Sequence, residues 1–316
     1  MPARPIIIDC DPGQDDAVAL FLAMSSPDEL DILGITTVAG NVPLGATERN
    51  ARMMCDVANR TDMFVFAGCD KPMQRDLVTA EYIHGNTGID GIDVFDPKTP
   101  LQETHAVDFI IDTLLARDKV TVTLIPTGPL TNIATAIDRN PDILEHVEEI
   151  VIMGGAMREG GNRTPSAEFN ILVDPHAADI VLNCGRPITL LGLDVTHQVL
   201  STKDRVDRIG ALNNSVADAT VGMLSFFHRY DTNKYSSQGT PLHDPCTIAW
   251  LLQPELFKTK KCNVSVETES ELTLGHTAVD FWHVTDRPRN VNWAFDVDAE
   301  GFYELLTERL SRFPLL

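Results

Sequence analysis

Four aspartates stand within eight residues near the start of the chain, in the segment Asp9–Asp16 with the sequence DCDPGQDD. Three isoleucines precede the segment and an apolar stretch follows it, which predicts a buried strand, a tight turn and a helix start. Helix capping and the helix dipole account for one or two of these carboxylates. Four converging carboxylates would repel one another unless a cation lay between them. The segment therefore predicts a Ca²⁺ or Mg²⁺ site with oxygen ligands.

Two known motifs with clustered aspartates do not fit this segment. An EF-hand loop beginning at Asp9 would need glycine and glutamate where the chain has Gln14 and Leu20. A haloacid-dehalogenase-type phosphotransferase would have Thr or Val where the chain has Gly13. The chain also lacks a GxxxxGK[ST] phosphate loop. A Mg²⁺ phosphotransferase is therefore the less favoured class of enzyme.

A second Asp-x-Asp sequence, Asp296–Asp298, ends one predicted strand and opens the last predicted helix. Aspartate is a preferred helix N-cap, because its carboxylate accepts hydrogen bonds from the first backbone amides. We expect Asp298 to be an N-cap and assign this pair no function.

The charge of the chain excludes whole classes of partner. It has 316 residues, with 25 Lys and Arg against 46 Asp and Glu, for a net charge of −21. Nucleic acids and anionic lipid surfaces are bound mainly through clustered basic residues, so neither is expected as a partner. No secretory h-region or membrane-spanning run is evident, and the six cysteines form no Cys-x-x-Cys pair. A cytoplasmic protein with reduced thiols is expected.

The elements that must position these side chains alternate along the first two-thirds of the chain. Strands are expected at 5–9, 32–38, 64–66, 120–125, 149–153 and 188–193. Amphipathic helices are expected at 15–25, 46–59, 106–117, 130–139 and 175–183. This alternation predicts an α/β fold with a mostly parallel, doubly wound sheet and helices on both faces. No linker divides the chain, so we expect a single domain, residues 1–316.

The last third has a different pattern. It contains expected helices at 214–230, 245–252 and 299–312, and runs of alternating character at 263–267, 278–285 and 291–297. These runs predict a small antiparallel addition near the C-terminus. Most of the strands in the parallel part are followed by polar, turn-forming segments, where a doubly wound sheet has its ligand crevice. These segments are 9–16, 39–41, 127–132, 154–155 and 194–197.

Together these segments resemble the inosine–uridine-preferring nucleoside hydrolases, and most closely their bacterial pyrimidine-specific members. The resemblance spans about residues 6–312. It rests on the segment 9–16 and on six others: AGN at 39–41, TGPLTN at 127–132, MGGA at 153–156, EFN at 168–170 with DP at 174–175, LDVTH at 193–197 and HDP at 243–245. It implies hydrolysis of the N-glycosidic bond of ribonucleosides, with uridine and cytidine favoured, to ribose and free base.

The resemblance also implies one bound Ca²⁺. Its ligands would be the carboxylates of Asp11, Asp16 and Asp244 and the backbone carbonyl of Thr127. The remaining positions would go to a water molecule and to the ribose 2′- and 3′-hydroxyls. Asp11 would activate the bound water, because a metal lowers the pKa of the water that it holds.

Two further groups of residues follow from the resemblance. The ribose would be bound by Asp15, Asn41, Met153, Asn162, Glu168 and Asn170. A histidine is suited to protonate the departing base near neutral pH, and His243 is the first candidate and His84 the second. For His197 we expect a structural role.

The segment 223–238 is expected to contact the base, with Tyr235 as the candidate residue. Phe227 and Asp231 depart from the hydroxyl and amide side chains typical of pyrimidine-specific relatives, so purine cleavage remains an alternative. A non-catalytic nucleoside- or sugar-binding protein is a second alternative. The resemblance further implies a homotetramer or dimer, and a role in either nucleoside salvage or catabolism.

Overall fold

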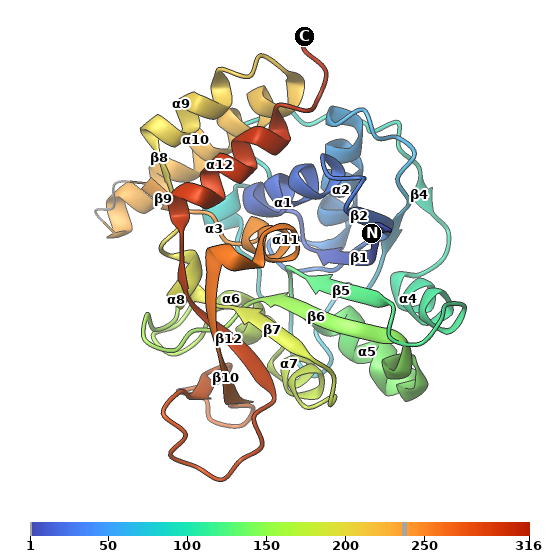
Figure 1. Cartoon of the computed structure of the whole chain (residues 1–316), viewed down its shortest axis with the longest axis vertical. Helices are drawn as coiled ribbons and strands as arrows, with labels where there is room; N and C mark the ends of the chain where they lie inside the picture. The colour runs from blue at the N-terminus through green and yellow to red at the C-terminus, as the bar shows by residue number, and fades with distance from the viewer. Residues whose placement is uncertain (1, 236–238) are drawn as a thin grey trace.

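A ten-stranded sheet runs through the centre of the molecule in the order β11-β10-β12-β7-β6-β5-β1-β2-β3-β4 (Figure 1). This computed structural model describes the backbone of residues 2–235 and 239–316, and the side chains of residues 2–227 and 239–316. The strands of the sheet are β1 Arg4–Cys10, β2 Leu30–Thr37, β3 Val65–Ala67, β4 Leu101–Gln102, β5 Val122–Pro126, β6 Val147–Met153, β7 Ile188–Leu191, β10 Phe257–Val266, β11 Thr277–Asp280 and β12 Val291–Val297. A separate ribbon pairs β8 Leu200–Thr202 with β9 Gly239–Pro241.

The helices alternate with these strands as the sequence predicts. They are α1 Gln14–Met24, α2 Leu44–Val57, α3 Glu81–His84, α4 Ala106–Leu115, α5 Thr131–Arg139, α6 Phe169–Val173, α7 Pro175–Leu182, α8 Leu193–Thr196, α9 Lys203–Gly210, α10 Ser215–Tyr235, α11 Pro245–Leu252 and α12 Ala299–Leu310. Short 3₁₀ turns occupy Pro141–His146 and Pro254–Leu256. Across the described residues, no helix is both long and apolar enough to cross a membrane.

The direction of pairing confirms the predicted fold class. Strands β1–β7 and β12 pair in parallel, whereas β10 pairs antiparallel with β12 and β11 pairs antiparallel with β10. From β1 the chain first builds outward through β2, β3 and β4, and then returns to the other side of β1 to add β5, β6 and β7. The strand order therefore reverses between β1 and β5, where ligands bind in open α/β sheets.

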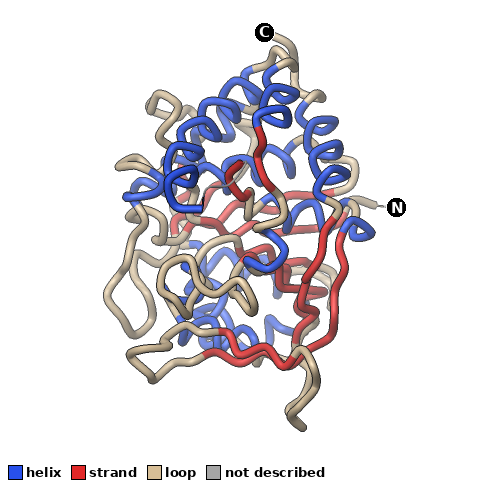
Figure 2. The backbone as a smooth tube through the Cα atoms, turned by 90° about the vertical axis from the view of Figure 1, so that its left-hand side faces the viewer, coloured by secondary structure: helices blue, strands red, loops and turns tan. Residues whose placement is uncertain are grey.

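Both faces of the sheet are covered, which is why its strands are continuous apolar runs. In β1, Ile6 and Ile8 join the core beneath α1, α2, α11 and α12, whereas Ile7 joins the core beneath α4, α5 and α7. Successive side chains of a strand point to opposite faces, so three consecutive isoleucines supply both cores. Figure 1 shows the two helix layers on either side of the strands, and Figure 2 shows the same layering from the side.

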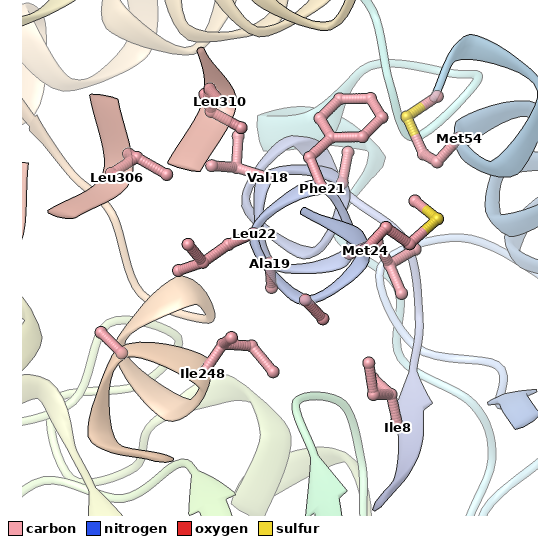
Figure 3. Packing of buried hydrophobic residues seen from close by; sticks show 14 of the residues in the cluster. Ile8, Val18, Ala19, Phe21, Leu22, Met24, Met54, Ile248, Leu306 and Leu310 are labelled. Carbon is pink, nitrogen blue, oxygen red and sulfur yellow. The ribbon is translucent and has the colours of Figure 1, made fainter. Parts of the chain in front are cut away.

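Helix α1 is buried along its whole length, and this fixes the position of the aspartates at its start. All eleven residues are buried. Val18, Phe21, Leu22 and Met24 lie among side chains from α2, α11 and α12 (Figure 3). A helix enclosed on all sides has apolar residues around its whole circumference, as in the stretch 17–24. Its N-terminus is therefore a rigid support for the polar groups beside it.

The structure differs from the sequence prediction mainly in short elements and strand ends. The run predicted at 278–285 is a strand only to Asp280, whose carboxylate accepts hydrogen bonds from the backbone amides of Val284 and Thr285 and closes a turn. The strand predicted at 188–193 ends at Leu191, because Gly192 begins helix α8. Helix α9 and the short elements α3, α6, α8, β4, β8 and β9 were not predicted.

Candidate active site

A cavity lies at the carboxyl ends of the parallel strands, beside the point where the strand order reverses. Asp9 of β1 pairs with Pro126 of β5, and the segments that follow these two strands carry Asp11 and Thr127. The cavity is lined by Asp15, Asn41, Ala80, Tyr82, Ile83, His84, Thr127, Met153, Asn162, Arg163, Glu168, Phe169, Asn170, His197, Phe227, Pro241, His243 and Asp244. Most of the residues that the sequence singled out therefore meet in one place.

Three carboxylates converge at this cavity. Asp15 and Asp16 belong to the first turn of α1, and Asp244 precedes the first turn of α11, which packs against α1. Each contributes an oxygen, and these oxygens lie within 4.8 Å of one another, with all three residues buried. Asp244 is far from the other two in sequence, so the packing of two helix N-termini creates the group.

Hydrogen bonds from the backbone and from neighbouring side chains orient the acids. The carboxylate of Asp11 accepts from the backbone N–H of Asn41, with 2.7 Å between nitrogen and oxygen. The carboxylate of Asp16 accepts from the backbone N–H of Gly13 at 3.0 Å and from the hydroxyl of Thr127 at 2.8 Å. Asn41 adds a side-chain N–H to Asp16 at 3.3 Å. The turn at 11–16 and the ends of β2 and β5 therefore form one network.

The electrostatics of the acids are unfavourable without a positive charge. Burial raises the pKa of Asp15 to about 7, and it raises the pKa values of Asp11, Asp16 and Asp244 above their usual range. Repulsion from neighbouring aspartates raises the pKa values of Asp11, Asp15 and Asp244 further. Within the described side chains, Oδ1 of Asp11 and Oδ1 of Asp15 are buried and have no hydrogen-bond partner. Buried oxygens left without a donor are costly unless a cation coordinates them.

The donor set therefore fits a hard divalent cation. Carboxylates and a nearby backbone carbonyl are the ligands that Ca²⁺ and Mg²⁺ use, and no thiol or imidazole belongs to the converging group. The group contains Asp16 and Asp244, two of the ligands that the resemblance implies, together with Asp15, while Asp11 does not belong to it.

Asp9, the first aspartate of the segment, has a different environment. Its Oδ1 accepts hydrogen bonds from the hydroxyl of Thr36 at 2.6 Å and from the side-chain amide of Asn132 at 2.8 Å. Asn132 also donates to the backbone carbonyl of Thr37 and accepts from the backbone N–H of Cys69. These contacts tie β1, β2 and α5 together. Burial raises the pKa of Asp9 to about 7, and its Oδ2 has no partner among the described side chains, but Asp9 belongs neither to the converging group nor to the cavity lining.

Amide and carboxyl side chains form another part of the cavity lining. Asn170 uses its N–H groups on the backbone carbonyls of Thr127 and Met153, at 2.7 and 3.2 Å, and its side-chain oxygen is not used in these contacts. Glu168 caps α6, because its carboxylate accepts from the backbone amides of Gly155, Asn170 and Ile171. Asn162 accepts from the backbone N–H of Phe169. These contacts hold the residues rigidly against the cavity.

Two buried histidines complete the polar lining. Nδ1 of His84 lies 2.6 Å from Oε1 of Gln14, and Nδ1 of His243 lies 2.7 Å from the hydroxyl of Thr196. Burial lowers the pKa of His84 to about 4 and that of His243 to about 3. Both rings are therefore neutral near pH 7, and each keeps one N–H to donate and one nitrogen to accept.

Several lining residues were not predicted from the sequence. His197 was expected to be structural, yet it lines the cavity, 5.8 Å from His243 between ring centres, and its Nδ1 lies 3.0 Å from a carboxylate oxygen of Glu159. The guanidinium of Arg163 lies over the ring of Tyr82 at 5.4 Å. His197 ends the segment LDVTH at 193–197, whereas Arg163 lies in a loop for which the sequence offered no motif. The side chain of the predicted base contact, Tyr235, lies outside the described residues.

A cavity with converging carboxylates, amides and histidines at the reversal point of a parallel sheet defines an α/β enzyme for a polar small molecule. The particular family follows from comparison with known proteins. The chain belongs to the inosine-uridine preferring nucleoside hydrolase family, which it matches from residue 6 to residue 304, and it is therefore a nucleoside hydrolase.

Individual relatives support this assignment over the whole chain. A pyrimidine-specific ribonucleoside hydrolase, RihA, from Photobacterium profundum is 48% identical over 98% of this chain and 100% of its own length. Among solved structures, the plant nucleoside hydrolase PpNRh1 superposes with a TM-score of 0.92 at 32% identity, covering 98% of this chain and 99% of its own. A purine-preferring ribonucleoside hydrolase from Gardnerella vaginalis has a TM-score of 0.90 at 34% identity, covering 98% of each chain.

Proposed function

We propose that this nucleoside hydrolase is Ca²⁺-dependent and prefers pyrimidine ribonucleosides such as uridine and cytidine. The observation that carries the metal dependence is the buried group of Asp15, Asp16 and Asp244, whose oxygens lie within 4.8 Å of one another. The pyrimidine preference is supported by the relative from Photobacterium profundum that is named for that specificity.

The proposed ligands of the cation are Asp16 and Asp244 of the converging group and, from the resemblance to the family, Asp11 and the backbone carbonyl of Thr127. Asp15 is assigned to the ribose. When bound, Ca²⁺ supplies positive charge that offsets the repulsion among the acids and lowers the pKa of a water molecule. Thr127 can take part because a carbonyl oxygen has two lone pairs, and its hydrogen bond from the Asn170 amide uses one of them.

The remaining chemistry belongs to the side chains of the protein. Oδ2 of Asp11 is engaged by the Asn41 amide, so its free Oδ1 is the atom that takes the proton from the attacking water. The reaction passes through a sugar with oxocarbenium character, as in other glycoside hydrolyses. Asp15, whose Oδ1 also has no partner among the described side chains, is the proposed contact of a ribose hydroxyl. Asn41, Met153, Asn162, Glu168 and Asn170 complete the proposed ribose site.

The departing base needs a hydrogen-bond donor or a proton. We assign this role first to His243, which lies next to Asp244 and lines the cavity, and second to His84. The Thr196 hydroxyl can donate to Nδ1 of His243, and the ring then presents Nε2–H to the base. The ring is neutral near pH 7, so it acts by donating this N–H rather than as a preformed imidazolium.

A panel of nucleosides tests this proposal. Release of reducing sugar is measured with uridine, cytidine, inosine and adenosine, before and after treatment with a chelator. We expect kcat/KM to be highest for the two pyrimidine nucleosides and turnover to be lost after chelation. A preference for inosine or adenosine would instead place the chain with purine-preferring relatives, and it would refute the pyrimidine assignment. Binding of all four without release of sugar would indicate a nucleoside-binding protein.

A further inference from the structure

Gln14 lies directly behind His84 and is fully buried in the first turn of α1. Its side-chain nitrogen donates to the backbone carbonyl of His84 at 3.0 Å and to that of Asp90 at 3.1 Å. Both amide hydrogens are thereby used. The other end of the amide, Oε1, lies 2.6 Å from Nδ1 of His84.

The two carbonyl contacts determine which way the amide of Gln14 faces. A flipped amide would place its oxygen 3.0 and 3.1 Å from two carbonyl oxygens, with no hydrogen between them. Oε1 therefore faces the histidine, and an amide oxygen can only accept a hydrogen bond. Nδ1 of His84 must then carry the proton. A neutral imidazole has a single N–H, so Nε2 of His84 is a lone-pair acceptor.

The surroundings of the ring keep it in this arrangement. The ring of Phe227 stacks on that of His84, with 5.5 Å between centres. Gly13 leaves the space that the ring of His84 occupies, since a Cβ at position 13 would lie 2.5 Å from Nδ1 of His84. The ring is buried but lines the cavity, so substrate can approach the nitrogen that Gln14 does not occupy.

His243 provides the contrast within the same cavity. Its Nδ1 faces the hydroxyl of Thr196, which can either donate or accept a hydrogen bond. Thr196 therefore permits both tautomers of His243, whereas Gln14 permits one tautomer of His84.

We propose that Gln14 is a positioning residue that holds His84 as the Nδ1–H tautomer, so that Nε2 accepts a hydrogen bond from a hydroxyl or N–H group of the bound nucleoside. This proposal rests on the proposed function for the identity of the ligand. It gives the two histidines different roles and removes His84 as the second candidate donor: His84 binds substrate as an acceptor, and His243 donates to the departing base.

The tautomer is read by ¹H–¹⁵N correlation of the histidine side chains in the Ca²⁺-loaded enzyme near pH 7, with His84→Gln used to assign the signals. We expect the unmodified protein to show a protonated Nδ1 and an unprotonated Nε2 for His84. A protonated Nε2 in the unmodified protein would overturn the proposal, and this result does not depend on whether any variant folds.

Substitutions at position 14 then connect the tautomer with substrate binding. Gln14→Met removes the acceptor at similar side-chain length, so the Nε2–H form should appear. Loss of one neutral hydrogen bond corresponds to a decrease in kcat/KM of about 2- to 10-fold, expected mainly as a higher KM. Gln102→Met on the edge strand β4 is the matched control and should change neither readout.

The outcomes separate this proposal from the proposed function. An unchanged kcat/KM in a Gln14→Met protein that has lost the Nδ1–H signal would refute the acceptor role of His84. An enzyme with the expected tautomer that cleaves purine nucleosides would refute only the pyrimidine preference. A decrease in kcat with KM unchanged would also contradict the proposal, because it would make His84 a group acting in the chemical step.

Discussion

The chain contains two Asp-x-Asp sequences in the same local setting, between a strand and a helix, but only one of them contributes to the candidate active site. Asp11 directly follows β1 and precedes α1, and Asp298 directly follows β12 and precedes α12. Asp296 is paired with Lys258 at 2.6 Å, which lowers the pKa of that carboxyl, and Asp298 accepts a hydrogen bond from the backbone N–H of Gly301. The structure thereby confirms the predicted N-cap at Asp298.

The aspartates of the other pair, Asp9 and Asp11, are buried. Asp11 has no exposed surface, and burial raises its pKa well above the usual range. The difference comes from the sheet. Strand β1 lies at the reversal of strand order, where α1 and α11 bring further carboxylates, whereas β12 lies between β7 and β10, away from that reversal. The position of a strand in the sheet, rather than the local motif, decides whether an aspartate is a cap or part of a reactive site.

The largest effect should come from the sugar, because Asp15 and the cation held beside it are proposed to bind the ribose diol. A site built around a substrate hydroxyl rejects an analogue without it by about 10⁴–10⁵. We therefore expect kcat/KM for 2′-deoxyuridine to be lower than that for uridine by this factor, as measured by release of reducing sugar. Comparable values for the two nucleosides would contradict binding of the diol by this cluster.

The next largest effect should distinguish the role of His243 in the departure of the base from the role of Asp11 in activating water. His243→Ala should reduce kcat for uridine by about 10²–10⁴, the usual contribution of general acid–base catalysis. It should leave p-nitrophenyl riboside nearly unaffected, since that leaving group departs without a proton. Asp11→Asn should impair both substrates, because water must be activated in either case. If His243→Ala slows both substrates equally, the role of His243 is to support Asp244.

The smallest effect is expected at the exposed pair. Asp298→Ala removes a helix N-cap, which contributes about 1 kcal/mol to stability. We expect kcat/KM for uridine to stay unchanged, while calorimetry shows Tm lowered by at most about 2–4 °C. A loss of activity in this variant at a temperature where it is folded would show that the two pairs are not functionally distinct.

The long elements of the fold were predictable because their physics is local. Apolar runs such as 6–8 and amphipathic stretches such as 106–117 carry their period in the sequence, and the structure has β1 and α4 at these places. Helix α6 and strand β4 contain only five and two residues, so they carry no period and depend on tertiary contacts. The strand predicted at 278–285 ends at Asp280 because the carboxylate of that residue closes a turn, which the alternating pattern of the sequence does not reveal.

The candidate site was predictable only in part. The segment 9–16 indicates a cation site from its residue types alone. Asp244 joins these acids only through the packing of α11 on α1, which no spacing in the sequence reveals. Only the family resemblance pointed to Asp244. Gln14 stands inside the motif, but the role proposed for it depends on contacts with the carbonyls of His84 and Asp90, which are distant in the sequence.

The central claim is that the buried carboxylates hold a Ca²⁺ that turnover requires. Its most direct test is uridine hydrolysis by exhaustively metal-depleted enzyme, with the metal content verified and Ca²⁺ then added back in steps. We expect no turnover in the depleted enzyme and full recovery at about one Ca²⁺ per chain. Tm should rise in parallel, because a ligand that binds only the folded state stabilises it. Full activity in a verified metal-free sample would contradict the account.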